Sequence, residues 1–93
     1  MLFVVLMQYS KPLTAVDAVR ADHIRHLESW AARGIVQAWA RRDPPSGGVI
    51  IAVAPSRKAL EATIAEDPYV RAGVAKAEIV EFDTANVRGA LKT

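Results

Sequence analysis

The pattern of apolar and polar positions divides the chain into six segments of regular structure. Residues 2–9 are almost continuously apolar and rich in valine, which is typical of a β-strand covered on both faces. The same pattern predicts further strands at 35–40, 49–54 and 77–82. Residues 41–48, with two prolines and two glycines, predict a loop. Helical spacing after the first and third strands gives the order β-α-β-β-α-β.

The first predicted helix begins near Thr14 and ends near Gly34. Thr14 and Asp17 match a variant of the capping box, and glycine commonly follows the last turn of a helix. Arg20 falls within the apolar sector of this helix, where a charged group has no structural purpose. At 100° per residue the apolar stripe itself consists of Val16, Val19, His23, Leu27 and Trp30.

The second predicted helix follows Ser56, which is expected to cap it, and turns Leu60 and Ile64 inward. It ends at Asp67, because the proline that follows disfavours helical geometry in the residue before it. Residues 83–93 have no strong pattern and are expected to form a tail that frays or lies on a partner.

This order predicts an α+β, ferredoxin-like domain with a four-stranded antiparallel sheet. Two helices can cover only one face of such a sheet, yet residues 2–7 and 49–54 are apolar on both faces. A second copy of the chain is the simplest cover for the other face. We therefore expect a homodimer in which two sheet faces pack together as a dimeric α/β barrel.

Composition narrows the classes of function. The 93 residues are 52% hydrophobic and 24% charged, as expected for a single folded domain spanning 1–93. The chain has no cysteine, which excludes disulfides, thiolate metal ligands and a cysteine nucleophile. Its net charge of +2 is not concentrated, so we expect no nucleic acid partner. The apolar run at 2–7 is too short to span a bilayer, and we expect a cytoplasmic protein without membrane contact.

His23 and Asp67 are the strongest candidates for chemistry. An imidazole on the apolar stripe of a helix is either a hydrogen-bonded histidine at the edge of the core or a functional group. Asp67 is either a simple turn former or a carboxylate that approaches His23 across the two helices. In the second case it would hold one tautomer of the imidazole and make a general acid or base.

Other polar residues are weaker candidates. Arg20 either extends outward to solvent or holds an anionic group of a ligand. Tyr9 ends the first strand, where it either packs locally or contributes to a pocket. His23 and His26 have the spacing of a shared metal ligand pair, but His26 is expected to point toward the polar side and no further ligands accompany it. Glycine-rich phosphate loops are absent too, so we expect no metal and no cofactor.

Along nearly its whole length, from residue 2 to about 82, the chain resembles the YciI-like (YCII-related) family. The matching pieces are individually short, but their order and spacing are specific: 9–13, 22–23 followed by Leu27 and Gly34, 47–50, 56–57, 66–74 and 79–82. The resemblance implies a dimeric α/β barrel, in agreement with the burial argument. It also implies that His23 and Asp67 are the family's acid/base pair, in a cleft beside the sheet.

Described members of this family resemble enzymes that act on small ring compounds by elimination or isomerisation, and the fold is shared with muconolactone isomerases. The sequence departs from the family pattern at 39–41, where Trp-Ala-Arg replaces a small residue followed by Gly-Pro. Arg41 is then available for an anionic substrate, or Trp39 plugs the cleft. The leading interpretation is a cofactor-free enzyme for a small organic substrate; the alternative is a non-catalytic homodimer that binds a small molecule in the same cleft.

Overall fold

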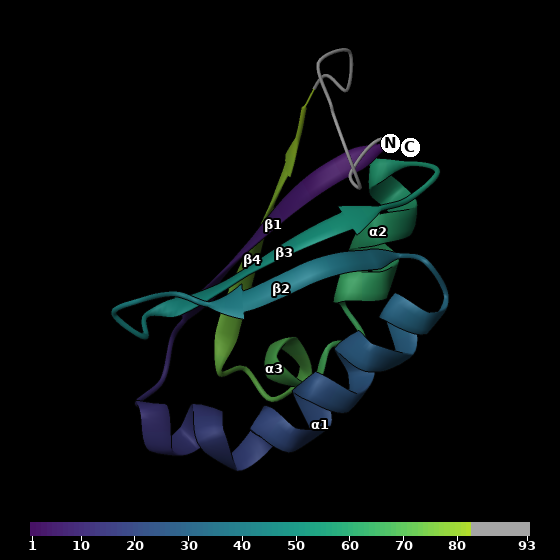
Figure 1. Ribbon diagram of the computed structural model, residues 1–93. Helices are drawn as coiled ribbons and strands as arrows, with labels where there is room; N and C mark the ends of the chain where they lie inside the picture. Colours follow the sequence, from purple (N-terminus) through teal and green to yellow (C-terminus); the bar gives the residue numbers. More distant parts are fainter. Residues whose placement is uncertain (83–93) are drawn as a thin grey trace.

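The computed structural model describes residues 1–82 and contains one sheet and three helices (Figure 1). The predicted tail at 83–93 lies outside the described residues. The elements in chain order are β1 (Leu2–Tyr9), α1 (Leu13–Ala32), β2 (Val36–Arg41), β3 (Gly47–Val53), α2 (Arg57–Ile64), α3 (Pro68–Arg71) and β4 (Ala75–Glu81).

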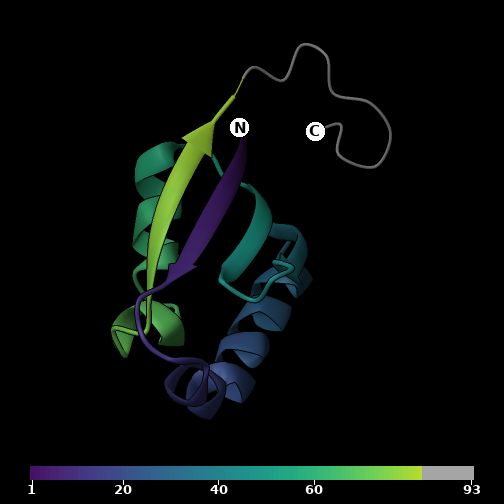
Figure 2. The ribbon, with the colours of Figure 1, turned by 90° about the vertical axis from the view of Figure 1, so that its left-hand side faces the viewer.

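The four strands form an antiparallel sheet in the order β2-β3-β1-β4. Val5, at the centre of β1, lies opposite Ile50 of β3 on one side and Ile79 of β4 on the other. Figure 2 shows the strands in front and both long helices behind them, on one face of the sheet. The fold is the predicted ferredoxin-like α+β arrangement. Within residues 1–82, no helix is long and apolar enough to cross a membrane.

The start of α1 differs from the prediction. Pro12, with φ −58° and ψ 153°, occupies the N-cap position, and no side chain caps the helix. The capping box that was predicted from Thr14 and Asp17 is therefore wrong, because the helix already begins at Leu13. At the other end the prediction is confirmed, since Gly34 adopts a φ of 80° just after the helix, in the region that glycine tolerates best.

The second helical region follows the prediction closely. The hydroxyl of Ser56 caps α2 by accepting a hydrogen bond of 3.1 Å from the backbone of Ala59. Leu60 and Ile64 are buried, as their spacing indicated. After the break at Asp67 the chain forms the short helix α3.

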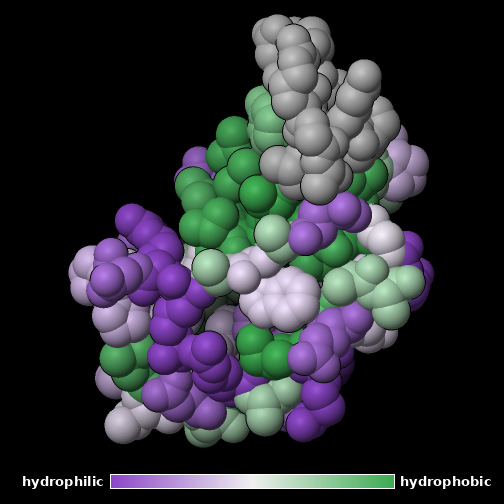
Figure 3. Space-filling view, viewed as in Figure 1, coloured by the Kyte–Doolittle hydropathy of each residue, from purple (hydrophilic) through white to green (hydrophobic). Residues whose placement is uncertain are grey.

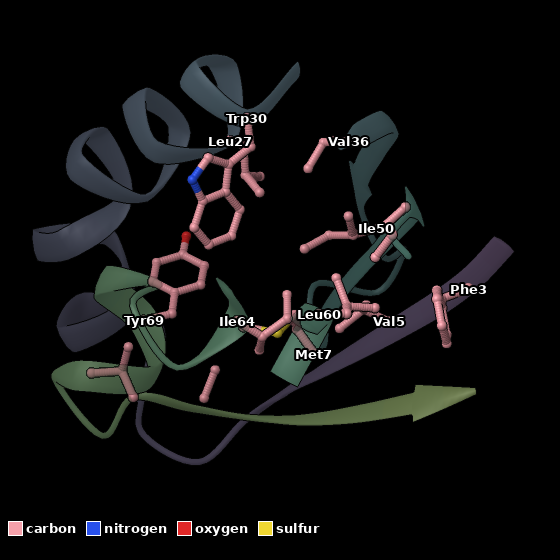
Figure 4. Close-up of a cluster of buried hydrophobic side chains, with 14 of the residues drawn as sticks. Phe3, Val5, Met7, Leu27, Trp30, Val36, Ile50, Leu60, Ile64 and Tyr69 are labelled. Carbon is pink, nitrogen blue, oxygen red and sulfur yellow. The ribbon is translucent and has the colours of Figure 1, made fainter. Parts of the chain in front are cut away.

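The hydrophobic core lies between the helices and the covered face of the sheet (Figure 4). Alternate residues of β1 point into it, because side chains of a strand alternate between the two faces. These residues are met by Leu27 and Trp30 from α1 and by Leu60 and Ile64 from α2. The members from the two central strands are Phe3, Val5, Met7, Ile50 and Ala52.

The opposite face of the sheet is also apolar. Val4 lies between Ile51 and Val80, and Leu6 lies between Val49 and Glu78. None of the three helices covers this face (Figure 2). In Figure 3 hydrophobic side chains gather over the strands in the upper part of the molecule, whereas the lower part over α1 is hydrophilic. We refer to Val4, Leu6, Val49, Ile51 and Val80 as the open face.

Candidate functional site

A cavity lies between α1, α3 and the neighbouring ends of β1, β2 and β3. It measures about 350 Å³, a volume that includes the part open to solvent. Its polar lining comes from Tyr9, Arg20, His23, Arg41 and Tyr69. Apolar side chains complete the wall, among them Met7, Ile24, Leu27, Trp39 and Ile50. The structure thus brings four of the five predicted site residues to one cavity, and the fifth, Asp67, lies directly behind it.

His23 and Asp67 are in contact, although 44 residues separate them in the sequence. Nδ1 of His23 lies 2.8 Å from Oδ1 of Asp67, and both residues are buried. Because a carboxylate only accepts hydrogen bonds, the neutral ring carries its proton on Nδ1 and donates it to Asp67. This leaves Nε2 as the nitrogen that can accept a proton from a molecule in the cavity.

The local fold holds Asp67 firmly in this position. Its side chain is the N-cap of α3, and Oδ1 also accepts a hydrogen bond of 2.8 Å from the backbone N–H of Tyr69. Pro68 follows in the first turn, where its missing N–H costs nothing. Asp67 is 0% exposed, and within residues 1–82 its second oxygen, Oδ2, has no hydrogen-bond partner. One oxygen therefore fixes both the helix and the imidazole.

Tyr69 also lines the cavity, although it was not among the predicted site residues. Its ring stacks on that of His23, with centroids 3.7 Å apart and an angle of 9° between the planes. Burial raises the pKa of Tyr69 above its ordinary value of 10.0, and the hydroxyl stays neutral. The Asp-Pro-Tyr sequence could have indicated this position of Tyr69. Asp67 caps the short helix that starts at Pro68, so the next residue, Tyr69, is held close to the Asp67 side chain.

Arg20 lies on α1 one turn before His23 and also lines the cavity. It is half-buried, and in the part of the chain that the structure describes it forms no ion pair and no side-chain hydrogen bond. A guanidinium next to an apolar wall attracts a planar anion such as a carboxylate, to which it can make two parallel hydrogen bonds.

Tyr9 and Arg41 are also side by side at the cavity. Nε of Arg41 donates a hydrogen bond of 3.0 Å to the hydroxyl of Tyr9. Nη2 of the same guanidinium donates a hydrogen bond of 2.6 Å to Asp17, in the first turns of α1. The carboxylate of Asp17 raises the pKa of Arg41 above its usual value, so this arginine is a permanent cation. Asp17 therefore has a role different from the capping role that the sequence suggested.

Residues 39–41 lie within strand β2 and do not form a turn. Trp39 and Arg41 are two positions apart, so their side chains point to the same face of the strand, and both residues line the cavity. Trp39 is 37% exposed, which places it at the rim of the cavity. Residues 39–41 thus contribute an aromatic ring and a cation to one wall of the cavity.

His26 lies differently from the prediction. It is half-buried, and its ring contacts that of Trp30, with centroids 3.5 Å apart. Burial lowers the pKa of His26, and the negative charges of Asp67 and Glu66 oppose this effect only in part. Within residues 1–82, no group of three or more His, Asp or Glu side chains has the arrangement of a metal site.

Comparison with known proteins supports this fold. A family model, the YCII-related domain, matches residues 1–83. A similar solved structure is 5-chloro-2-hydroxyhydroquinone dehydrochlorinase (TftG) from Burkholderia phenoliruptrix AC1100 in complex with 2,5-dihydroxybenzoquinone, with 20% identity and a TM-score of 0.76, covering 89% of this chain and 94% of that one.

A second similar structure is an antibiotic biosynthesis monooxygenase, with 22% identity and a TM-score of 0.58, covering 89% of this chain and 97% of the other. No curated protein sequence matches significantly. At these identities the two structures show a common fold, so the chemistry has to be argued from the cavity.

Proposed function

Because the chain belongs to the family of YCII-related domains, we propose that it is a cofactor-free enzyme for proton transfer on a small organic molecule. The observation that carries this proposal is the buried His23–Asp67 pair at the wall of a cavity. A histidine whose one nitrogen is bound to a carboxylate and whose other nitrogen faces a ligand is the usual form of a general acid or base.

In the proposed reaction Nε2 of His23 removes a proton from the substrate. The electron pair of the broken C–H or O–H bond stays on the substrate, and the negative charge is delocalised onto an oxygen. Asp67 stabilises the imidazolium that forms, because its carboxylate lies 2.8 Å from Nδ1. The imidazolium then either returns the proton to a different atom of the substrate, which is an isomerisation, or the electron pair expels a leaving group and the proton passes to water, which is an elimination.

The residues that line the cavity favour a ring-containing, anionic substrate. Its wall is mainly apolar and includes the partly exposed ring of Trp39, whose face suits a planar ring. Arg20 provides a cation one turn from His23 and without a partner in the described part of the chain, so a carboxylate or phenolate on the ring would be held beside the base. The dehydrochlorinase with the same fold is named for a hydroxylated ring compound, which is consistent with this class.

We also propose that the enzyme is a homodimer joined through the open face. This face has an apolar centre formed by Val4, Leu6 and Ile51 on the two middle strands of the sheet. Val80, on edge strand β4, is 38% exposed. A contiguous apolar sheet surface of this kind is unfavourable in water, and a second copy related by a two-fold axis buries the same residues from both chains.

The function is tested by replacing the base and a matched histidine. Chloride release from 5-chloro-2-hydroxyhydroquinone reports elimination, and deuterium incorporation into cyclic keto acids in D₂O reports proton abstraction. His23→Gln is expected to reduce either activity by about a hundredfold or more, the usual contribution of a general base. His26→Gln, on the same helix but outside the cavity lining, is the control and should keep most activity. If the wild-type protein binds these compounds without turnover, the proposal of an enzyme is wrong and a binding protein is the better interpretation.

A further inference from the structure

A second series of hydrogen-bonded side chains reaches the same cavity, and we call it the polar chain. It runs from Asp17 on α1, through Arg41 on β2, to Tyr9 at the end of β1. Resting on the proposed function, we propose that this chain presents the hydroxyl of Tyr9 to the substrate oxygen that becomes negative when His23 removes a proton. Tyr9 would then be a catalytic residue, and Arg41 and Asp17 would be positioning residues that act through it.

The direction of the hydrogen bonds supports this assignment. Arg41 has only donors, so at 3.0 Å it occupies a lone pair of the Tyr9 hydroxyl. The hydroxyl hydrogen of Tyr9 is then free to point elsewhere, and a cation on the lone pair makes this O–H a stronger donor. Because Tyr9 lines the cavity, a ligand oxygen is a suitable acceptor.

Tyr69 connects this chain with the base. Its ring meets that of Tyr9 edge to face, with centroids 5.9 Å apart and an angle of 87°, and it stacks on His23 at 3.7 Å. The polar chain and the His23–Asp67 pair therefore end at one cavity with a single aromatic ring between them. A ring compound over this wall would have the base at one end and a hydroxyl donor at the other.

The Asp17–Arg41 pair is poorly explained as a device for stability. The side chain of Asp17 is 52% exposed and that of Arg41 is 26% exposed, and ion pairs of this kind stabilise proteins little. Its geometric effect is larger, because it turns the guanidinium so that Nε points at Tyr9. Breaking the pair should therefore affect ligand binding more than folding.

Each member of the chain contributes one part of the charge stabilisation. The proton moves from the substrate to Nε2 of His23, and the electron pair ends on the substrate oxygen. The Tyr9 O–H shortens its hydrogen bond to this oxyanion without giving up its proton, so no further reactant is needed. Arg41, a cation directly behind the hydroxyl, lowers the energy of the same negative charge.

The test uses two probes of similar shape, 4-nitrophenolate and the neutral 4-nitroanisole. Their binding to the wild-type protein and to the variants Tyr9→Phe and Asp17→Asn is measured by fluorescence titration. Loss of a hydrogen bond to a charged oxygen predicts that Tyr9→Phe weakens 4-nitrophenolate binding about tenfold or more. Asp17→Asn should weaken it severalfold, and neither variant should change the binding of 4-nitroanisole.

Asp22→Asn is the matched control. Asp22 is an exposed aspartate on the same helix, paired with Arg25 and outside the cavity lining, so this variant should bind both probes like the wild type. If Tyr9→Phe and Asp17→Asn bind 4-nitrophenolate like the control, the inference is overturned while the His23–Asp67 proposal stands. The inference is also overturned if both probes lose affinity equally, because the tyrosine then only packs. If the wild type binds neither probe, the proposed ligand class itself fails, and the inference fails with it.

Discussion

Replacing Asp67 by alanine removes a carboxylate that has two structural functions at once. Its Oδ1 accepts hydrogen bonds from Nδ1 of His23 and from the backbone of Tyr69, each of 2.8 Å. Asp67→Ala breaks both contacts. Asp67→Asn is the matched variant, because an amide oxygen can accept the same two hydrogen bonds without the negative charge.

The expected loss of stability follows from these contacts. An N-cap is worth about 1 kcal/mol of unfolding free energy. Leaving the buried N–H of His23 without an acceptor costs roughly 1–3 kcal/mol. Asp67→Ala should therefore lower the unfolding free energy by about 2–4 kcal/mol. Asp67→Asn only exchanges charged for neutral hydrogen bonds and should lose about 1 kcal/mol.

Urea denaturation, followed by tryptophan fluorescence at one protein concentration, measures both losses. With a slope of about 1 kcal/mol per molar urea, the midpoint should fall by roughly 2–4 M for Asp67→Ala and about 1 M for Asp67→Asn. The reasoning is refuted if Asp67→Ala unfolds at the wild-type midpoint, or if the two variants lose the same stability. The first result would mean that the carboxylate does not hold His23 and the start of α3, and the second would mean that an amide oxygen cannot replace it as the acceptor.

Three further predictions concern pH, strand packing and assembly. Burial lowers the pKa of His26 below its ordinary value of 6.5, so the unfolded chain binds a proton more readily than the folded one. The stability should therefore fall as the pH drops through about 6.5, and His26→Phe should flatten the urea midpoints between about pH 7.5 and 5.5. A Cβ at Gly47 would overlap the carbonyl oxygen of Met7, whereas one at Gly48 would lie 3.2 Å from that of Ala40. Gly47→Ala should thus cost about 2–3 kcal/mol by urea denaturation and clearly more than Gly48→Ala; equal losses would contradict the close approach of β3 to the backbone of β1. Ile51→Glu, on the open face, should convert a dimer into a folded monomer in sedimentation experiments, and a monomeric wild-type protein would contradict the proposed assembly.

Local periodicity was sufficient to predict the order of the strands and helices and to place two site residues on one helix. The apolar stripe of α1 placed His23 and Arg20 on one side of the helix, and this depends only on the angle between successive residues. The ends of the strands were less accurate, because they depend on pairing with neighbours. β3 begins at Gly47 rather than at residue 49, since Gly47 and Gly48 pair with Gln8 and Met7 of β1.

Apart from the approach of Asp67 to His23, which the sequence raised as one of two alternatives, contacts between distant segments could not be predicted from the pattern. The stacking of Tyr69 on His23 depends on the short helix α3, whose position is set by the whole sheet. The pairing of Asp17 with Arg41 depends on where β2 ends relative to the start of α1. In the sequence, Asp17 had a plausible local role as a helix cap, and only the tertiary arrangement shows that its side chain turns to an arginine of the sheet.

The proposed chemistry depends most on the orientation and protonation of His23. Nitrogen-15 NMR of the ring, on the neutral form of the wild-type protein, distinguishes which nitrogen carries the proton. The hydrogen bond to Asp67 predicts a proton on Nδ1 and a bare Nε2 facing the cavity. In Asp67→Ala this preference should disappear. A wild-type ring with its proton on Nε2 would contradict the account, because that nitrogen could then not accept a proton from a substrate.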